Sequence, residues 1–424
     1  MTNAMSRRTV MRSLAGAGVG ALVLGLTACD PTGAGDPDGT GALPPSGQPS
    51  GQPGGLPTGS PTGSPTDTPG TPTATAAPTT AAPTATGTPG ARRFGAEWEN
   101  HLRTVMSWPS SENIWGEQLA EVRRDVAGLA QAIAAREPVV LMARPDQKEA
   151  AQKACGAAVE VVPVTVDDLW ARDTVPVFVE EGGKVKGVDF NFNGWGRKQQ
   201  HANDAKVARA VLAKYGVERI ETRLVAEGGS FETDGEGTLL VTESSVVNDN
   251  RNPGMSRDQV EAELKKALGV TKVIWLAGVK GKDITDAHVD CLVRFVAPGV
   301  VVLDKAFPGT PADVWSRSAD QARSVLRNAT DARGRKLEVV ELQQPDPDRI
   351  TGRGDAFVSS YMNFYIGAKG VYLPKFGDQK ADEHAQQVLK KYFPTREIVP
   401  VKIDGIAGGG GGIHCATHDI PAHG

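Results

Sequence analysis

From about residue 91 onward, hydrophobic residues recur in two alternating patterns. Segments with apolar residues at helical spacing, such as 116–136 and 257–268, alternate with short apolar runs typical of buried strands, such as 138–143. Because this interleaving is typical of helices packed on sheets, it predicts an α/β fold. The expected helices are 116–136, 147–154, 204–215, 257–268, 315–328 and 382–392, and the expected strands are 138–143, 159–164, 238–242, 245–248, 272–276, 289–296, 300–303, 337–342, 364–373 and 397–401.

The first ninety residues lack this pattern, and the beginning of the segment is typical of an export signal. Ser6-Arg7-Arg8 begins a twin-arginine motif, and the apolar stretch 14–26 is too short and too glycine-rich to span a membrane. Residues 26–29 (LTAC) resemble a lipobox, in which Cys29 is acylated after cleavage; plain signal cleavage is the alternative. We therefore expect a protein exported by the twin-arginine route, extracytoplasmic and lipid-anchored to the cell membrane, with residues 1–29 as its lipoprotein signal.

Residues 30–91 are almost wholly Gly, Pro, Thr, Ser and Ala. Such a composition cannot bury enough apolar surface to offset its ordering entropy, so it predicts a disordered linker. No second linker interrupts residues 92–424, which we therefore interpret as one folded domain. The sequence leaves its oligomeric state open.

Charge and cysteine content bear on the possible partners of the protein and on the state of its thiols. The net charge of −4, without a basic stripe, argues against nucleic acid as a partner. Once Cys29 is set aside, Cys155, Cys291 and Cys415 are left, and three cysteines cannot all pair within one chain. At least one free thiol is expected.

Residues 408–412 are five consecutive glycines, followed by Ile413-His414-Cys415. Glycine loses more backbone entropy on ordering than any other residue and packs no side chain, so such a run indicates a place where backbone must pass close to a ligand. Cys415 then lies where a nucleophile is needed. The alternative is a flexible C-terminal tail with a chance thiol.

Three further polar clusters occur where burial is expected. Asp173 lies in 170–176 (WARDTVP), Glu227 lies in 226–232 (AEGGSFE), and His288 and Asp290 precede an apolar run. If His288 and Asp290 begin a strand, its two-residue period places both side chains on one face. Turn residues, caps or a surface pair are the simpler alternatives.

A metal site is a competing interpretation. His288, Asp290, His414, Cys415 and His418 include zinc-ligand types, but no Cys-x-x-Cys or His-Glu-x-x-His spacing occurs. Neighbours such as His414 and Cys415 on an extended segment would also point to opposite faces. We expect no metal, and the sequence contains no dinucleotide fingerprint or phosphate-binding loop.

Taken in order, these motifs resemble those of the agmatine deiminases, which belong with the bacterial peptidylarginine deiminases to the guanidine-modifying enzymes. The resemblance rests on residues 170–176, 226–230, 243–253, 288–290 and the glycine run with Ile-His-Cys, and it extends from about residue 97 to 421. It implies a five-bladed, pseudo-symmetric α/β propeller (pentein-like) around a central site, and makes residues 92–424 a deiminase domain. The hydrophobic pattern permits this architecture without indicating it.

By the same resemblance, Cys415 is the nucleophile, His288 the general acid/base, and Glu227 the carboxylate that orients that histidine. Asp173 and Asp290 grip the guanidinium, and Trp170 contributes to substrate binding. A guanidinium is a planar cation rich in donors, which paired carboxylates can hold over a thiolate.

The implied reaction converts a guanidino group into a ureido group and ammonia through an S-alkylthiouronium on Cys415, without a cofactor. Agmatine, giving N-carbamoylputrescine, is the leading substrate among small guanidines, and an arginine side chain in a peptide is the alternative. A hydrolase or amidinotransferase acting on another guanidine stays open. So does a cell-surface binding protein for cationic amines or guanidines that has lost turnover.

Four positions depart from the family pattern. Val175 and Ala287 stand where glycine is usual, Ile284 replaces a glutamate, and Gly412 replaces a common asparagine. These changes lie beside the site, and two remove polar groups. We therefore expect altered selectivity for the far end of the substrate, and a weak preference for agmatine.

Overall fold

The computed structural model describes residues 91–422 apart from 353 and 355. The predicted signal and nearly all of the predicted linker, Cys29 included, lie outside the described residues. Within the described part, helices and strands alternate as the hydrophobic pattern predicts, and the α/β class is confirmed.

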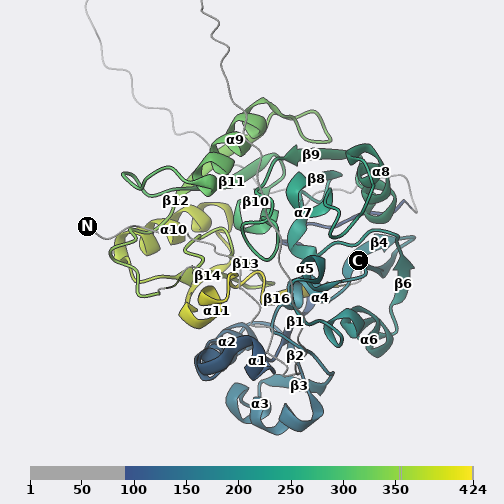
Figure 1. Cartoon of the computed structure of the whole chain (residues 1–424), viewed down its shortest axis with the longest axis vertical. Helices are drawn as coiled ribbons and strands as arrows, with labels where there is room; N and C mark the ends of the chain where they lie inside the picture. Colours follow the sequence, from purple (N-terminus) through teal and green to yellow (C-terminus); the bar gives the residue numbers. More distant parts are fainter. Residues whose placement is uncertain (1–90, 353, 355, 423–424) are drawn as a thin grey trace, which may run out of the picture. The chain divides into compact units, whose positions relative to one another are not determined.

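The described part of the chain repeats one unit around the centre of Figure 1, and its strands form five separate sheets. In four units an antiparallel strand pair is followed by a helix and a third strand that runs parallel to the second. The units are β4 (Val177–Glu181), β5 (Lys184–Asp189), α6 (Val207–Tyr215) and β6 (Glu218–Glu221); β7 (Glu232–Thr233), β8 (Thr238–Thr242), α8 (Arg257–Leu268) and β9 (Lys272–Leu276); β10 (Val293–Ala297), β11 (Val300–Lys305), α9 (Val314–Asn328) and β12 (Glu338–Gln343); and β13 (Tyr365–Ile366), β14 (Gly370–Lys375), α10 (Gln379–Tyr392) and β15 (Glu397–Lys402).

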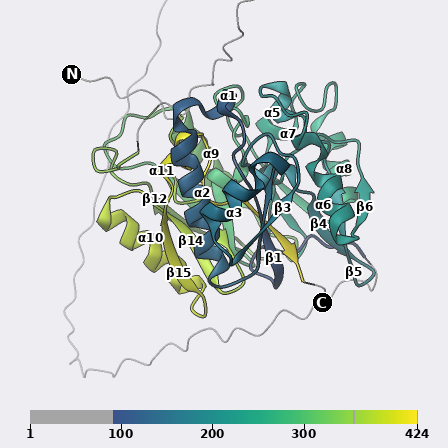
Figure 2. The ribbon, with the colours of Figure 1, turned by 90° about the horizontal axis from the view of Figure 1, so that it is seen from below.

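The fifth sheet joins residues from both ends of the described chain, in the order β16-β1-β2-β3. Strand β16 (Thr417–Pro421) pairs antiparallel with β1 (His101–Ser107), beside the C-terminus in Figure 2. Strands β2 (Val139–Ala143) and β3 (Val159–Pro163) follow in parallel. Cys415 lies in the turn that leads into β16, so this pairing fixes the segment that carries it.

Helix α2 (Leu119–Ala134) illustrates why the elements form. Its residues Val122, Val126, Leu129 and Ile133 recur at helical spacing and are fully buried, which gives the helix one apolar face. It packs beside α3 (Lys148–Cys155) in the same unit (Figure 1). Burial of each such side chain contributes roughly 1.5–3 kcal/mol.

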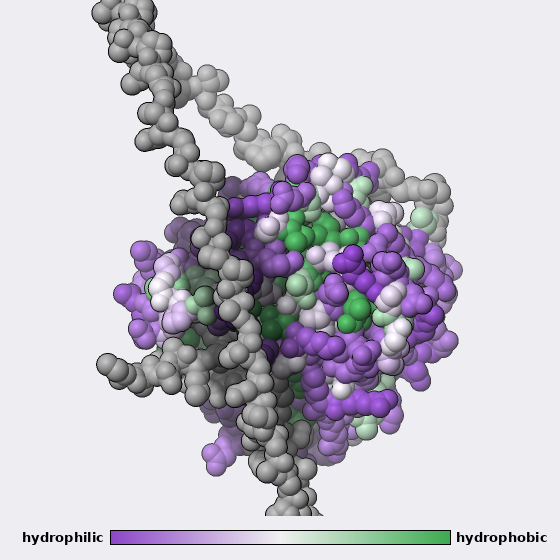
Figure 3. All heavy atoms as spheres, turned by 45° about the horizontal axis from the view of Figure 1, so that its top comes forward, coloured by the Kyte–Doolittle hydropathy of each residue, from purple (hydrophilic) through white to green (hydrophobic). Residues whose placement is uncertain are grey.

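The largest hydrophobic cluster extends from α2 to the predicted site. It includes Trp115, Trp170, Cys291, Ile413 and Cys415, so the predicted nucleophile lies inside the core. Outside, hydrophilic side chains predominate around smaller apolar patches on the face drawn in Figure 3. Among the described residues, Leu102 is the single large hydrophobic side chain that is exposed, and no helix combines the length and apolar character of a membrane span.

One predicted strand is wrong. Residues 245–248 do not form a strand; instead Glu243–Val246 is a helical turn, α7. Its short polar side chains bond nearby backbone, with Ser245 Oγ donating to the Thr242 carbonyl and Asn248 Nδ2 to that of Ser244, which competes with a strand ladder.

The predicted strand 289–296 begins late. Val289–Cys291 is a 3-10 turn, η5, and β10 starts only at Val293. The two-residue period therefore does not apply to His288 and Asp290. The predicted strand 364–373 is likewise divided into β13 and β14 by a turn that Gly367 and Gly370 close.

Candidate active site

Three of the polar motifs meet around Gly229. A Cβ at this position would lie 2.6 Å from His288 Nδ1, 3.0 Å from Asp173 Oδ1 and 3.2 Å from Asp290 Oδ2, so only glycine fits. Asp173 lies on the helical turn α4 (Ala171–Thr174), Gly229 on η4 (Gly228–Ser230) and Asp290 on η5. The structure thus brings these predicted site residues together.

His288 is held by a buried chain of charges. Its Nε2 lies 3.2 Å from Glu227 Oε2, and Glu227 accepts from Arg251 Nε at 2.8 and 2.9 Å. Burial alone lowers the pKa of His288, but the carboxylates of Asp173 and Glu227 outweigh it and raise that pKa to about 9. In the empty site the ring is therefore an imidazolium at neutral pH.

The Glu227 carboxylate is ionised. Burial opposes ionisation, but Arg251 and His288 together hold the pKa of Glu227 below its usual value. Its position matches the orienting role that the resemblance implies. Arg251 comes from the 248–253 motif, to which the sequence assigned no individual role.

Asp173 and Asp290 differ in their surroundings. Asp173 accepts from Trp195 Nε1 at 2.8 Å and from the Gly229 N–H at 3.1 Å, and its burial raises its pKa. Burial acts on Asp290 in the same direction, but contact of its Oδ2 with His414 Nδ1 at 2.8 Å holds the pKa of Asp290 well below the usual range. Within the described part of the chain, Asp290 Oδ1 is buried without a hydrogen-bond partner.

Cys415 Sγ lies 3.4 Å from Asp290 Oδ2. The amide Nδ2 of Asn363 lies 3.2 Å from Cys415 Sγ, and equally far from Cys291 Sγ and Asp290 Oδ2. Contact with Cys291, burial and the Asp290 carboxylate raise the pKa of the Cys415 thiol well above its usual value. Asn363 belongs to no sequence motif and was not expected at the site, and Cys291 was expected only as a free thiol, although it directly follows Asp290.

The glycine run serves the protein's own packing. A Cβ at Gly411 would collide with the Trp170 ring, and one at Gly412 would lie 2.7 Å from Asn363 Oδ1. Close approach of backbone therefore serves the protein's own packing at these two glycines, while Gly409 and Gly410 line a cavity that Trp170 also lines, and their approach to a ligand stays a prediction. The segment is buried and hydrogen-bonded, which excludes the flexible-tail alternative.

His414 and Cys415 do not point apart. Residues 413–416 form a turn, closed by the Ala416 N–H on the Ile413 carbonyl at 3.2 Å, and both side chains reach Asp290 Oδ2. The expectation from an extended segment is wrong for this reason. His418 turns elsewhere, with its Nδ1 2.9 Å from the Asp419 carbonyl oxygen, so the five candidate metal ligands of the sequence do not form one set.

An open cavity lies beside the site. Trp170 lines it, and the rings of Trp170 and Trp115 lie 6.1 Å apart. Asp168 also lines it, and accepts from Trp115 Nε1 at 2.7 Å and from Gln199 Nε2 at 2.8 Å. Ile284 contributes an apolar side chain to the same wall.

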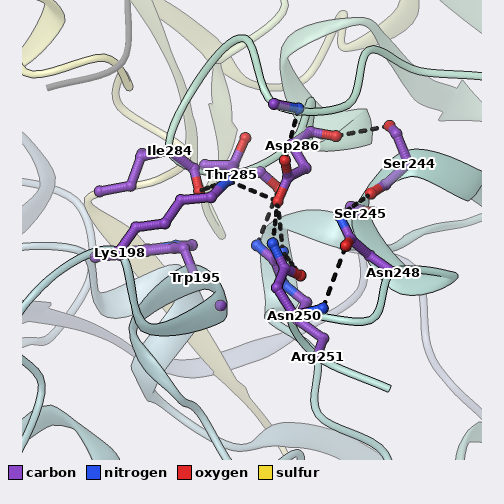
Figure 4. Close-up of polar contacts among 12 residues, drawn as sticks. Trp195, Lys198, Ser244, Ser245, Asn248, Asn250, Arg251, Ile284, Thr285 and Asp286 are labelled. Carbon is purple, nitrogen blue, oxygen red and sulfur yellow. Dashed lines mark hydrogen bonds and ion pairs between the residues drawn. The ribbon is translucent and has the colours of Figure 1, made fainter. Parts of the chain in front are cut away.

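The turn that carries Ile284 and Ala287 is held from several sides (Figure 4). Asp286 and Ala287 have φ of 60° and 65°, a left-handed conformation that favours glycine. Lys198 Nζ donates to Asp286 Oδ2 at 2.7 Å, and Ser244 Oγ to the Asp286 carbonyl at 2.6 Å. Val175 is different, because its φ of −73° suits any residue and glycine's freedom is not required there.

Comparisons with known proteins show the family to which this chain belongs. The model of a family described as Porphyromonas-type peptidyl-arginine deiminase matches residues 93–421. The agmatine deiminase of Stutzerimonas stutzeri is 38% identical over 351 residues, covering 77% of this chain and 95% of the relative. That of Medicago truncatula is 35% identical over 359 residues, covering 77% and 96%.

A solved structure, an agmatine deiminase of Enterococcus faecalis described as catalysing its reaction, has a TM-score of 0.73 at 30% identity and covers 78% of this chain and 96% of its own. The fold and the site define a hydrolase that acts on the C–N bonds of guanidino groups. The chain belongs to the Porphyromonas-type peptidyl-arginine deiminase family, and the resemblance seen in the sequence is confirmed.

Proposed function

We propose that this protein is an exported deiminase that converts a guanidino group into a ureido group and ammonia through a covalent intermediate on Cys415. The observation that carries the proposal is the convergence of Asp173, His288 and Asp290 around Gly229, with Cys415 Sγ 3.4 Å from Asp290 Oδ2. Two carboxylates there suit the donors of a planar cation, and a thiol lies next to them.

In the first half-reaction, Cys415 Sγ bonds to the central carbon of the guanidinium and one C–N bond breaks. The His288 imidazolium gives its proton to the departing nitrogen, which leaves as ammonia. In the second half-reaction, the neutral His288 takes a proton from water, whose oxygen bonds to the same carbon. The C–S bond then breaks and releases the ureido product and the thiol.

The raised pKa of Cys415 gives the substrate a part in its own activation. Two buried carboxylates and the Cys291 contact disfavour a thiolate in the empty site. A bound guanidinium places a positive charge beside those carboxylates, which favours ionisation of the thiol, and the thiol proton passes to solvent because His288 is already protonated. The nucleophile therefore forms once the substrate is present.

Agmatine, with N-carbamoylputrescine as product, is the substrate that we propose first, because the relatives in the comparison are named agmatine deiminases. The family description favours peptidyl-arginine as the second candidate. Release of ammonia and ureido product from agmatine, free arginine and an arginine peptide distinguishes them. Binding without product release would instead support a non-catalytic guanidine-binding protein.

We also propose the closed five-bladed propeller for the five repeated units, and a lipid anchor at Cys29 for the exported protein. The twin-arginine motif and the lipobox-like LTAC support the anchor. Cys29→Ala is expected to release the protein into the aqueous phase on detergent partitioning without changing its specific activity, because a long linker transmits no strain. Partitioning equal to wild type would contradict the anchor.

A further inference from the structure

Cys291 is a buried thiol that the proposed reaction does not use. It ends η5, directly after Asp290, and its Sγ, Cys415 Sγ and a carboxylate oxygen of Asp290 all lie within 4.8 Å of one another. We propose that Asp290, Cys291 and Cys415 bind one zinc ion, and that bound zinc silences the deiminase. The inhibitory half of this inference rests on the proposed function of Cys415.

The donor set suits zinc. Zinc takes thiolate sulfur at about 2.3 Å and carboxylate oxygen at about 2.0–2.2 Å in tetrahedral geometry. Two sulfurs in such a complex are about 3.8 Å apart, so side-chain rotation can place these ligands around one ion. A disulfide needs a closer approach, because its sulfurs lie at about 2.05 Å.

The three groups already face one point. Asn363 Nδ2 lies 3.2 Å from each of Cys291 Sγ, Cys415 Sγ and Asp290 Oδ2. An amide nitrogen has two N–H donors, so it cannot satisfy three acceptors at once. A metal ion can replace these weak contacts with bonds to all three ligands, and water can supply the fourth.

The carboxylate ligand is oriented from behind. His414 Nδ1 contacts Asp290 Oδ2 at 2.8 Å, and His414 Nε2 lies 3.0 Å from Glu97 Oε1. Such an outer shell fixes the direction of a ligand and raises metal affinity. These three ligands differ from the candidate metal ligands named from the sequence, because they include Cys291 and exclude His418.

One of the three ligands also lines an open cavity. Cys291 and His288 line it together with Gln344 and Phe357, and it is separate from the cavity lined by Trp170. Bound zinc would occupy both the nucleophile and one of the carboxylates that grip the guanidinium. Zinc and the guanidine substrate are therefore expected to compete.

Zinc titration of the purified full chain against a chromophoric chelator tests the site, with a phosphine reductant because thiol reductants bind zinc. Wild type is expected to bind one zinc per chain tightly, with activity lost in parallel and restored by EDTA. Cys291→Ser is expected to bind at least tenfold more weakly, and its own activity should resist zinc to the same degree. Cys155→Ser, a buried thiol at the end of α3, is the matched control and should behave like wild type.

Two outcomes would overturn the site. The first is a Cys291→Ser variant that binds zinc and is inhibited by it like wild type. The second is activity that is lost on zinc addition and restored by a reductant but not by EDTA, which would indicate a disulfide. Cobalt(II) titration of wild type does not depend on whether a variant folds. If bound cobalt shows no thiolate charge-transfer absorption, the site is also excluded. If zinc binds in a Cys291-dependent way while no guanidine is turned over, the proposed function fails and the metal site stands.

Discussion

Arg251 and Glu227 form a fully buried ion pair in which Arg251 Nε lies 2.8 and 2.9 Å from the two carboxylate oxygens. The other end of the guanidinium is fixed as well, because its Nη1 donates to Asp286 Oδ2 at 2.8 Å. Glu227 in turn contacts His288. The orientation of the proposed general acid/base is therefore linked to the strained turn at Asp286 (Figure 4).

Replacement of Arg251 by glutamine should affect both stability and turnover. It leaves Glu227 buried without its cation, and losing one partner of a buried pair costs about 3–5 kcal/mol. We expect a lower free energy of unfolding by urea and a fall in kcat larger than any rise in KM. Arg257→Gln is the control, because the Arg257 side chain is half-exposed and its partner Glu243 lies 3.6 Å away. Equal effects of the two substitutions would argue against the link.

Cys415→Ser should abolish turnover. A serine hydroxyl stays protonated near neutral pH, so the loss in kcat is expected to be on the order of 10³-fold or more. Guanidine binding, followed by calorimetry, should survive because both carboxylates remain. Substantial residual deimination would place the nucleophile elsewhere.

Asp173→Asn and Asp290→Asn each keep the shape of the side chain and remove one charge that faces the substrate. We expect each substitution to raise the activation free energy by about 3 kcal/mol, which lowers kcat/KM roughly 100-fold. Asp146→Asn, on an exposed side chain, is the control. A wild-type kcat/KM in either site variant would make that carboxylate structural.

Stability should depend on pH through His288. Its pKa is raised from 6.5 to about 9 in the folded protein, where burial is outweighed by Asp173 and Glu227, so the folded state binds the proton more tightly than the unfolded state. The resulting stabilisation is fully present below pH 6.5 and is lost as pH rises through 9.

Urea unfolding between these pH values should therefore show a falling free energy of unfolding, and His288→Asn should flatten the curve. An unchanged slope in this variant would assign the pH dependence to other groups.

Substrate preference should reflect Ile284. By the sequence resemblance, this apolar side chain stands where the family has a glutamate, so the distal ammonium of agmatine is expected to lack one acceptor in the cavity that Ile284 and Trp170 line. We expect agmatine to be little better than a neutral alkylguanidine of similar length, and Ile284→Glu to favour agmatine. A strong preference for agmatine in wild type would assign the distal contact to another acid, with Asp168 in the same cavity as the first to replace by asparagine.

The sequence predicted elements whose signals are local. Helix α8 begins and ends as expected because Ser256 and Gln259 form a capping box and Gly269 adopts a left-handed φ of 72°. The resemblance also selected five polar residues that the structure gathers into one buried cluster. Their catalytic roles stay predictions.

What the sequence could not predict depends on contacts between distant segments. The β1–β16 pairing joins two ends of the domain, and neither strand was expected. Asn363 contacts three site residues from a loop without a motif, and Arg251 acts only through Glu227. The strand expected over 289–296 starts only at Val293, because apolar spacing does not distinguish the 3-10 turn η5 from the start of β10.

The position of β16 also makes the proposed site dependent on a pairing between distant parts of the chain. The sheet that contains β1 and β2 is completed by a strand from the other end of the domain, and Cys415 is held by the turn directly before that strand. A chain that has formed its other four sheets but not this pairing therefore does not yet hold its proposed nucleophile in place. During refolding, activity is expected to appear only once β16 has paired with β1.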